Sequence, residues 1–152
     1  MRRCLLDTAV FVYADGGEHP YREPCMNVLR WAEEGVISAT ASVELLQEYA
    51  SVKLRRRNAD RQRVARQARR IADVCELHDF ERRDVPLMLD LLERHERLDA
   101  RDALFAATAL NNGIDAIVAT DRAFDDVPGL ERIDPADSTA LVTLTNGRLR
   151  RR

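Results

Sequence analysis

Several features are scarce in this 152-residue sequence, and each scarcity excludes a class of protein. The three cysteines, Cys4, Cys25 and Cys75, are odd in number and widely spaced, which predicts reduced core thiols and argues against a disulfide framework or a zinc site. Lys53 is the only lysine, so the late lysine of a receiver domain is missing. No glycine-rich phosphate loop is present, and no apolar run approaches the roughly 18 residues of a membrane helix. We therefore expect no membrane span.

The hydrophobic content is that of a folded chain. Hydrophobic residues make up 45% of the sequence, which is too much for a disordered chain and enough for one compact core. We therefore expect a single domain over residues 1–152. Met1 to Leu6 is similar to the start of a secretory signal, but Asp7 interrupts the apolar stretch and no small-residue cleavage site follows. This pattern predicts a cytoplasmic protein.

Charge is strongly segregated along the chain. The 24 basic and 26 acidic residues give a formal net charge of −2, yet the cationic segment from Lys53 to Arg70 holds nine basic residues and one acid, Asp60. Four more arginines lie within 148–152, which leaves the rest of the chain acidic. The cationic segment could contact RNA, could contact an acidic partner, or could be a solvated helix face, and the sequence leaves all three interpretations open.

Short apolar runs alternate with stretches of helical periodicity. The run at 4–6 predicts a buried strand that leads, through the apolar residues at 10–13, into a turn or short helix. Further strands are expected at 36–39, 116–119 and 131–133, and helices at 21–34, 43–50, 60–75, 84–95 and 102–110. Gly35 ends the first of these helices, Ser42 caps the second, and the second and third form a hairpin. This alternation predicts an α/β fold with a parallel sheet.

Acidic residues follow two of the predicted strands. Asp7 ends the run at 4–6 and Asp121 follows the run at 116–119, and the carboxyl ends of parallel strands form the ligand crevice of an open sheet. Asp102 and Glu48 lie on helices that follow or flank these strands, so the crevice gathers four acids. We expect no lysine or other cation of the chain's own to balance them. Because packed carboxylates repel one another, this arrangement predicts a hard divalent cation, Mg²⁺ or Mn²⁺.

Each acid also has a purely structural interpretation. Asp7 could cap the turn that follows it, and Asp121 could form an Asx-turn. Asp102 could cap the alanine-rich helix or complement its dipole, and Glu48 could pair with one of the arginines at 55 and 56. For any single acid these roles are the more common ones, but two strand-end acids in one βα pattern favour a site.

Four sequence motifs resemble the successive motifs of PIN-domain ribonucleases and, within them, of VapC-type toxins of bacterial toxin–antitoxin pairs. They are Leu5-Leu6-Asp7-Thr8, Ser42-Val43-Glu44-Leu45-Leu46-Gln47-Glu48-Tyr49, Arg101-Asp102-Ala103-Leu104-Phe105-Ala106-Ala107 and Ala119-Thr120-Asp121-Arg122-Ala123-Phe124. The resemblance extends from about Arg3 to Pro135, and the order of the four motifs makes it fairly specific. It implies a PIN-like three-layer sandwich, with a mostly parallel central sheet between helices, an acidic metal site and RNA cleavage.

The resemblance also assigns the site residues by position. The metal ligands and catalytic acids that it implies are Asp7, Glu48, Asp102 and Asp121. Glu44 lies one turn before Glu48 on the same helix face and is the alternative acid, although the Leu-Gln-Glu-Tyr context favours Glu48. Three further acids flank the motifs and could add a water-mediated ligand or have no role in the site. They are Asp99, Asp125 and Asp126.

These residues suit phosphodiester hydrolysis. One or two Mg²⁺ ions lower the pKa of the attacking water and neutralise charge on the entering and leaving oxygens. We expect the three motif aspartates to bind metal directly or through water, and Glu48 to bind metal or to orient the attacking water. Thr8 and Thr120 could bind a metal-bound water or a phosphate oxygen. The prediction is a Mg²⁺- or Mn²⁺-dependent endoribonuclease that acts as a toxin.

The partners follow from the resemblance alone. In VapC-like proteins a small VapB-like antitoxin commonly wraps the toxin and places a basic side chain in the acidic site, and the toxin commonly forms a homodimer. RNA is the implied substrate. The alternative function is a PIN-like module that binds RNA or protein without nuclease activity. Such modules usually lose one or more of the acids, whereas all four are present here.

Overall fold

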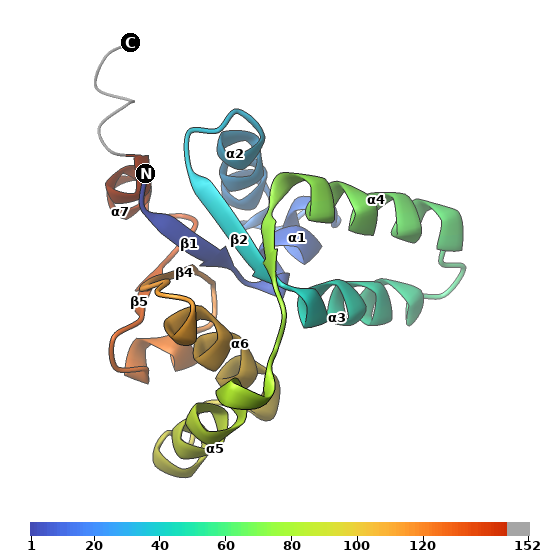
Figure 1. The fold of residues 1–152 in the computed structure, drawn as a ribbon. Helices are drawn as coiled ribbons and strands as arrows, with labels where there is room; N and C mark the ends of the chain where they lie inside the picture. The colour runs from blue at the N-terminus through green and yellow to red at the C-terminus, as the bar shows by residue number, and fades with distance from the viewer. Residues whose placement is uncertain (146–152) are drawn as a thin grey trace.

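The central element of the fold is one parallel sheet. The computed structural model describes residues 1–145, so the arginines at 148–152 lie outside the described residues. The sheet has five strands in the order β3-β2-β1-β4-β5, and all four neighbouring pairs are parallel (Figure 1). The strands are β1 Arg3–Leu6, β2 Ser38–Ser42, β3 Glu76–His78, β4 Ala116–Val118 and β5 Glu131–Ile133. The predicted parallel α/β fold is confirmed.

Helices cover both faces of this sheet (Figure 1). They are α1 Thr8–Ala14, α2 Arg22–Glu33, α3 Val43–Leu54, α4 Arg61–Val74, α5 Val85–Arg94, α6 Ala100–Asn111 and α7 Ser138–Val142. Helix α1 packs against α2 and α3, and α3 packs against α4, whereas α6 packs against α5 and β2. None of the helices within residues 1–145 is long and apolar enough to cross a membrane.

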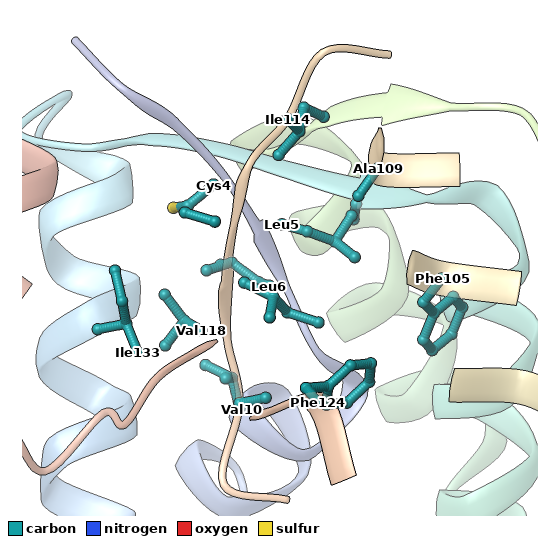
Figure 2. Close-up of a cluster of buried hydrophobic side chains, with 14 of the residues drawn as sticks. Cys4, Leu5, Leu6, Val10, Phe105, Ala109, Ile114, Val118, Phe124 and Ile133 are labelled. Carbon is teal, nitrogen blue, oxygen red and sulfur yellow. The ribbon is translucent and has the colours of Figure 1, made fainter. Parts of the chain in front are cut away.

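The core lies between the sheet and the helices, as Figure 2 shows for one part of it. Leu5 and Leu6 of β1 and Val118 of β4 are buried, and Phe105 of α6 is buried in the same core cluster. Four alanines of α6 are completely buried, which lets the helix approach the sheet closely; they are Ala103, Ala106, Ala107 and Ala109. The three cysteines are buried and free, as the sequence predicted.

The strand order reverses between β1 and β4, and this reversal positions the acids. Beginning at β1, the chain adds β2 and β3 on one side and then crosses back to add β4 and β5 on the other. Crevices at such reversals are the usual ligand sites of open parallel sheets. Asp7 leaves β1 at this point, and its backbone N–H donates to the Val118 carbonyl at 3.0 Å. The carboxyl ends of the two central strands are therefore fixed side by side.

Two strands differ from the sequence prediction. Val36 and Ile37 were expected to begin a strand, but their backbone N–H groups donate to the Trp31 carbonyl at 2.8 and 3.3 Å, which closes the end of α2. The strand itself consists of the small residues from Ser38 to Ser42, which fit under tightly packed helices. Strand β3 was not predicted, because three residues without apolar alternation carry no strand pattern.

The caps of the helices explain their limits. Ser42 caps α3 as predicted, with its Oγ accepting from the Glu44 N–H, and Asp60 caps α4. The predicted hairpin of α3 and α4 is confirmed, and it projects from the sheet in Figure 1. Helix α6 begins at Ala100, two residues before the predicted start, because Asp99 and not Asp102 is its N-cap.

Candidate functional site

Three aspartates lie where strands end or helices begin at one edge of the sheet. Asp7 is the residue between β1 and α1, and Asp121 follows β4 and accepts from the Ala123 N–H at 2.9 Å. Asp102 lies in the first turn of α6, where its N–H donates to Asp99 Oδ1 at 2.8 Å. Asp7 and Asp102 are each 7% exposed, whereas Asp121 is exposed. The edge therefore has two buried carboxyls and one that faces solvent.

The two buried carboxyls respond to one another and to their neighbours. Burial raises the pKa of Asp7 to about 6, and the negative charge of Glu48 raises it further, against the opposing effect of the Thr8 and Ala9 N–H groups. The pKa of Asp102 is raised to about 7, first by burial and then by the charges of Asp99, Asp7 and Asp121. These mutual effects place the four predicted acids within one electrostatic cluster, the acidic edge.

Glu48 reaches the acidic edge from α3. Its Oε2 accepts from the Thr8 hydroxyl at 2.7 Å, immediately after Asp7, and its side chain is only 14% exposed. Glu44 has a different environment, because its carboxylate accepts a short hydrogen bond from the Ser42 hydroxyl while its backbone N–H donates to Ser42 Oγ. Glu48 therefore faces the strand ends, and Glu44 belongs to the capped start of α3.

The expectation that the acidic edge has no cation of its own is wrong. Arg101 Nη1 lies 2.6 Å from Glu48 Oε1, and Arg101 Nη2 lies 3.1 Å from Asp99 Oδ2. Its charge also lowers the pKa of Asp7 and Asp102 against the larger effect of burial. The sequence carries no signal for this contact, because Arg101 and Glu48 lie far apart in the chain and meet only in the folded structure.

The other flanking acids have structural partners. Asp125 Oδ1 accepts from Arg132 Nε at 2.6 Å, and Asp126 forms a two-point ion pair with Arg97 at 2.7 Å for each hydrogen bond. With Asp99 engaged as the cap of α6, each of the three acids left open by the sequence has a partner within the chain.

The donor set fits a hard divalent cation in its chemistry. Carboxylate oxygens are the ligands that Mg²⁺ and Mn²⁺ prefer, and two of these carboxyls are buried with too little counter-charge to keep their pKa values normal. Among residues 1–145, however, no three acidic, histidine or cysteine side chains already stand in ligating positions. Ligation of one ion by three of these carboxylates would therefore require them to move closer together.

The cationic segment is less uniform than its sequence suggests. Lys53 is 5% exposed and its Nζ lies 3.2 Å from Asp15 Oδ2, and Arg63 pairs with the same carboxylate at 3.2 Å. Arg70 pairs with Glu33. These three cations hold α3 and α4 to the rest of the domain. The exposed arginines of the segment that remain outside these pairs are Arg55, Arg56, Arg57, Arg61, Arg66 and Arg69.

Comparison with known proteins identifies the family of the chain. The PIN domain family model matches residues 4–130. The chain belongs to the PIN-domain family. Over 151 residues this PIN domain is 36% identical to Ribonuclease VapC7 of Mycobacterium tuberculosis. The alignment covers 95% of this chain and 99% of the relative. It is 32% identical over 131 residues to the VapC ribonuclease Mb1869c of Mycobacterium bovis, covering 85% of the chain and 98% of the relative.

Solved structures share the fold of this PIN domain at low sequence identity. VapBC2 from Rickettsia felis, bound to a promoter DNA fragment, aligns with a TM-score of 0.66 at 17% identity, over 86% of this chain and 97% of the other. VapC20 of Mycobacterium tuberculosis, described as a sarcin-ricin loop cleaving toxin, aligns with a TM-score of 0.63 at 22% identity, over 78% and 90%. These neighbours support the predicted PIN-like sandwich.

Proposed function

We propose that this PIN domain is a Mg²⁺- or Mn²⁺-dependent endoribonuclease that acts in the cytoplasm as the toxin of a toxin–antitoxin pair. The observation that carries the proposal is the acidic edge, where Asp7 and Asp102 are buried beside further carboxylates and the pKa values of these two aspartates are raised. The relatives that the chain matches over nearly their full length are VapC ribonucleases, and they support the same activity. The chain retains all four acids, whereas a non-cleaving module usually loses one or more of them.

In this proposal Asp7, Asp102 and Asp121 hold the metal directly or through water, and Glu48 is a further ligand or orients the attacking water. A bound divalent cation supplies a water of lowered pKa and neutralises charge on the phosphate oxygens. Thr8 donates to Glu48 and so holds that carboxylate toward the strand ends. Exposed Asp121 and half-exposed Arg101 give the edge an open side for the RNA backbone.

The proposed partners are an RNA substrate, a VapB-like antitoxin and a second copy of the chain. Structural neighbours that are toxin–antitoxin complexes support an antitoxin. The six exposed arginines of the cationic segment provide positive charge for a polyanion, while the three paired cations, Lys53, Arg63 and Arg70, do not. Homodimer formation rests on the family resemblance.

Cleavage of purified RNA tests the activity. Wild-type protein should cut RNA at internal positions with Mg²⁺ or Mn²⁺ and should stop when EDTA is added. Asp121→Asn should lose cleavage without losing stability, because its carboxylate is exposed. Asp126→Asn is the matched control, since its carboxylate pairs with Arg97 outside the acidic edge, and this variant should cut normally. RNA that is bound but never cut would favour the non-enzymatic module.

A further inference from the structure

Arg101 lies against one of the acids of the proposed metal site. Its guanidinium contacts Glu48, which is one of the four acids of the proposed site, at 2.6 Å. The Glu48 carboxylate is 14% exposed and already accepts from Thr8, so little of its surface remains for a third partner. A guanidinium and a divalent cation compete for the same carboxylate oxygen, because the two positive charges repel each other at that distance.

The Arg101 guanidinium has access to solvent and to a second acceptor. The Arg101 side chain is 51% exposed, and its second contact is Asp99, whose side chain is 55% exposed. Exposed ion pairs of this kind are individually weak and exchange readily with solvent. Asp99 is held in place because its Oδ1 caps α6. Its Oδ2 therefore remains an acceptor for Arg101 at the same edge when the Glu48 contact opens.

We propose that Arg101 is a built-in counter-ion that competes with the divalent metal for Glu48, so that metal binding displaces this guanidinium toward solvent and the substrate side of the edge. Arg101 is thus a positioning residue that weakens metal binding until the ion is abundant enough to displace it. The inference rests on the proposed metal site, but it makes a separate claim about affinity.

The contact has a second, independent consequence. While Arg101 pairs with Glu48 and Asp99, it supplies the acidic edge with positive charge from within the chain. Removing it should therefore leave the carboxylates more dependent on a cation. A purely structural link between α6 and α3 predicts the opposite, since loosening those helices would disperse the ligands and weaken metal binding.

Calorimetric titration of Mn²⁺ alone, without RNA, distinguishes these outcomes. Arg101→Gln should bind Mn²⁺ about fivefold more tightly than wild type, the gain expected from removing one partly exposed ion pair. Arg101→Lys keeps the charge and should return the affinity to within about twofold of wild type. Arg83→Gln is the matched control, because Arg83 is 55% exposed and pairs with Glu81 at 2.7 Å outside the acidic edge, and it should bind like wild type.

A double-mutant cycle keeps the inference testable if Arg101→Gln alters stability. In a Glu48→Gln background the same Arg101→Gln change should alter Mn²⁺ affinity by less than about twofold, because the carboxylate for which the two cations compete is gone. Equal or weaker binding by Arg101→Gln than by wild type overturns the role of Arg101. Absence of Mn²⁺ binding by both proteins overturns the metal site itself, and Asp7→Asn, which should bind poorly, shows that the measured heat comes from that site.

Discussion

Replacing Asp7 with asparagine should stabilise the fold, because the wild-type carboxyl is buried beside other acids. The pKa of Asp7 is raised from 3.8 to about 6, and each pKa unit corresponds to about 1.4 kcal/mol. The folded state binds the proton more tightly than the unfolded state, so stability is lost as the pH rises from about 4 through 6. At pH 8 the ionised carboxyl costs up to about 3 kcal/mol, and near pH 4 it costs less than about 1 kcal/mol.

Urea unfolding of wild type and Asp7→Asn in EDTA, at pH 8 and at pH 4, measures this cost. We expect Asp7→Asn to raise the free energy of unfolding by about 2–3 kcal/mol at pH 8 and by much less at pH 4. Asp126→Asn is the control, since Arg97 lowers the pKa of this exposed carboxyl, and the variant should not gain stability at pH 8. A gain of equal size at both pH values, or a loss at pH 8, would refute the electrostatic reasoning.

Three further predictions concern Glu48, Lys53 and metal binding. Glu48→Gln should remove most RNA cleavage at little cost in stability. Glu44→Gln should retain cleavage and lower the free energy of unfolding by a few tenths of a kcal/mol up to about 1 kcal/mol. Reversed results would move the site by one helical turn. Lys53→Met should lower the free energy of unfolding by about 1–3 kcal/mol, because the buried pair with Asp15 is lost. Arg57→Gln, at an exposed position, should lower it by less than about 0.5 kcal/mol. Losses of similar size in the two variants would contradict this prediction. Millimolar Mg²⁺ should raise the melting temperature of wild type but not of Asp7→Asn, and equal shifts would count against the site.

Much of the fold and the nearness of Asp7 to the other acids could be predicted from sequence, because parallel strands end at a common edge. Apolar runs bounded by Asp7 and Asp121 gave the strand ends, and helical periodicity gave five helices to within a few residues. The rule that carboxyl ends form the crevice then brought the strand-end acids together. Strand β3 was not predicted, because it pairs with β2 through backbone groups and has no apolar pattern.

The pairing of cations could not be predicted from sequence, because it depends on contacts between distant segments. Arg101 meets Glu48 only when α6 and α3 lie across the same sheet edge, and neither local spacing nor composition carries that contact. Lys53 looked like part of a cationic surface, but the packing of α1 against α3 brings Asp15 to its ammonium group. Long side chains reach several neighbours, so their partners follow from tertiary structure.

The most direct test of the central claim is metal rescue of RNA cleavage at the acidic edge. After the cleaved bond is mapped, one non-bridging oxygen of its phosphate is replaced by sulfur, which binds Mg²⁺ poorly and the softer Mn²⁺ better. The account predicts slow cleavage of this RNA by wild type in Mg²⁺, recovery in Mn²⁺, and no cleavage by Asp121→Asn with either ion. Cleavage by Asp121→Asn at the wild-type rate, or sulfur substitution without effect in Mg²⁺, would contradict it.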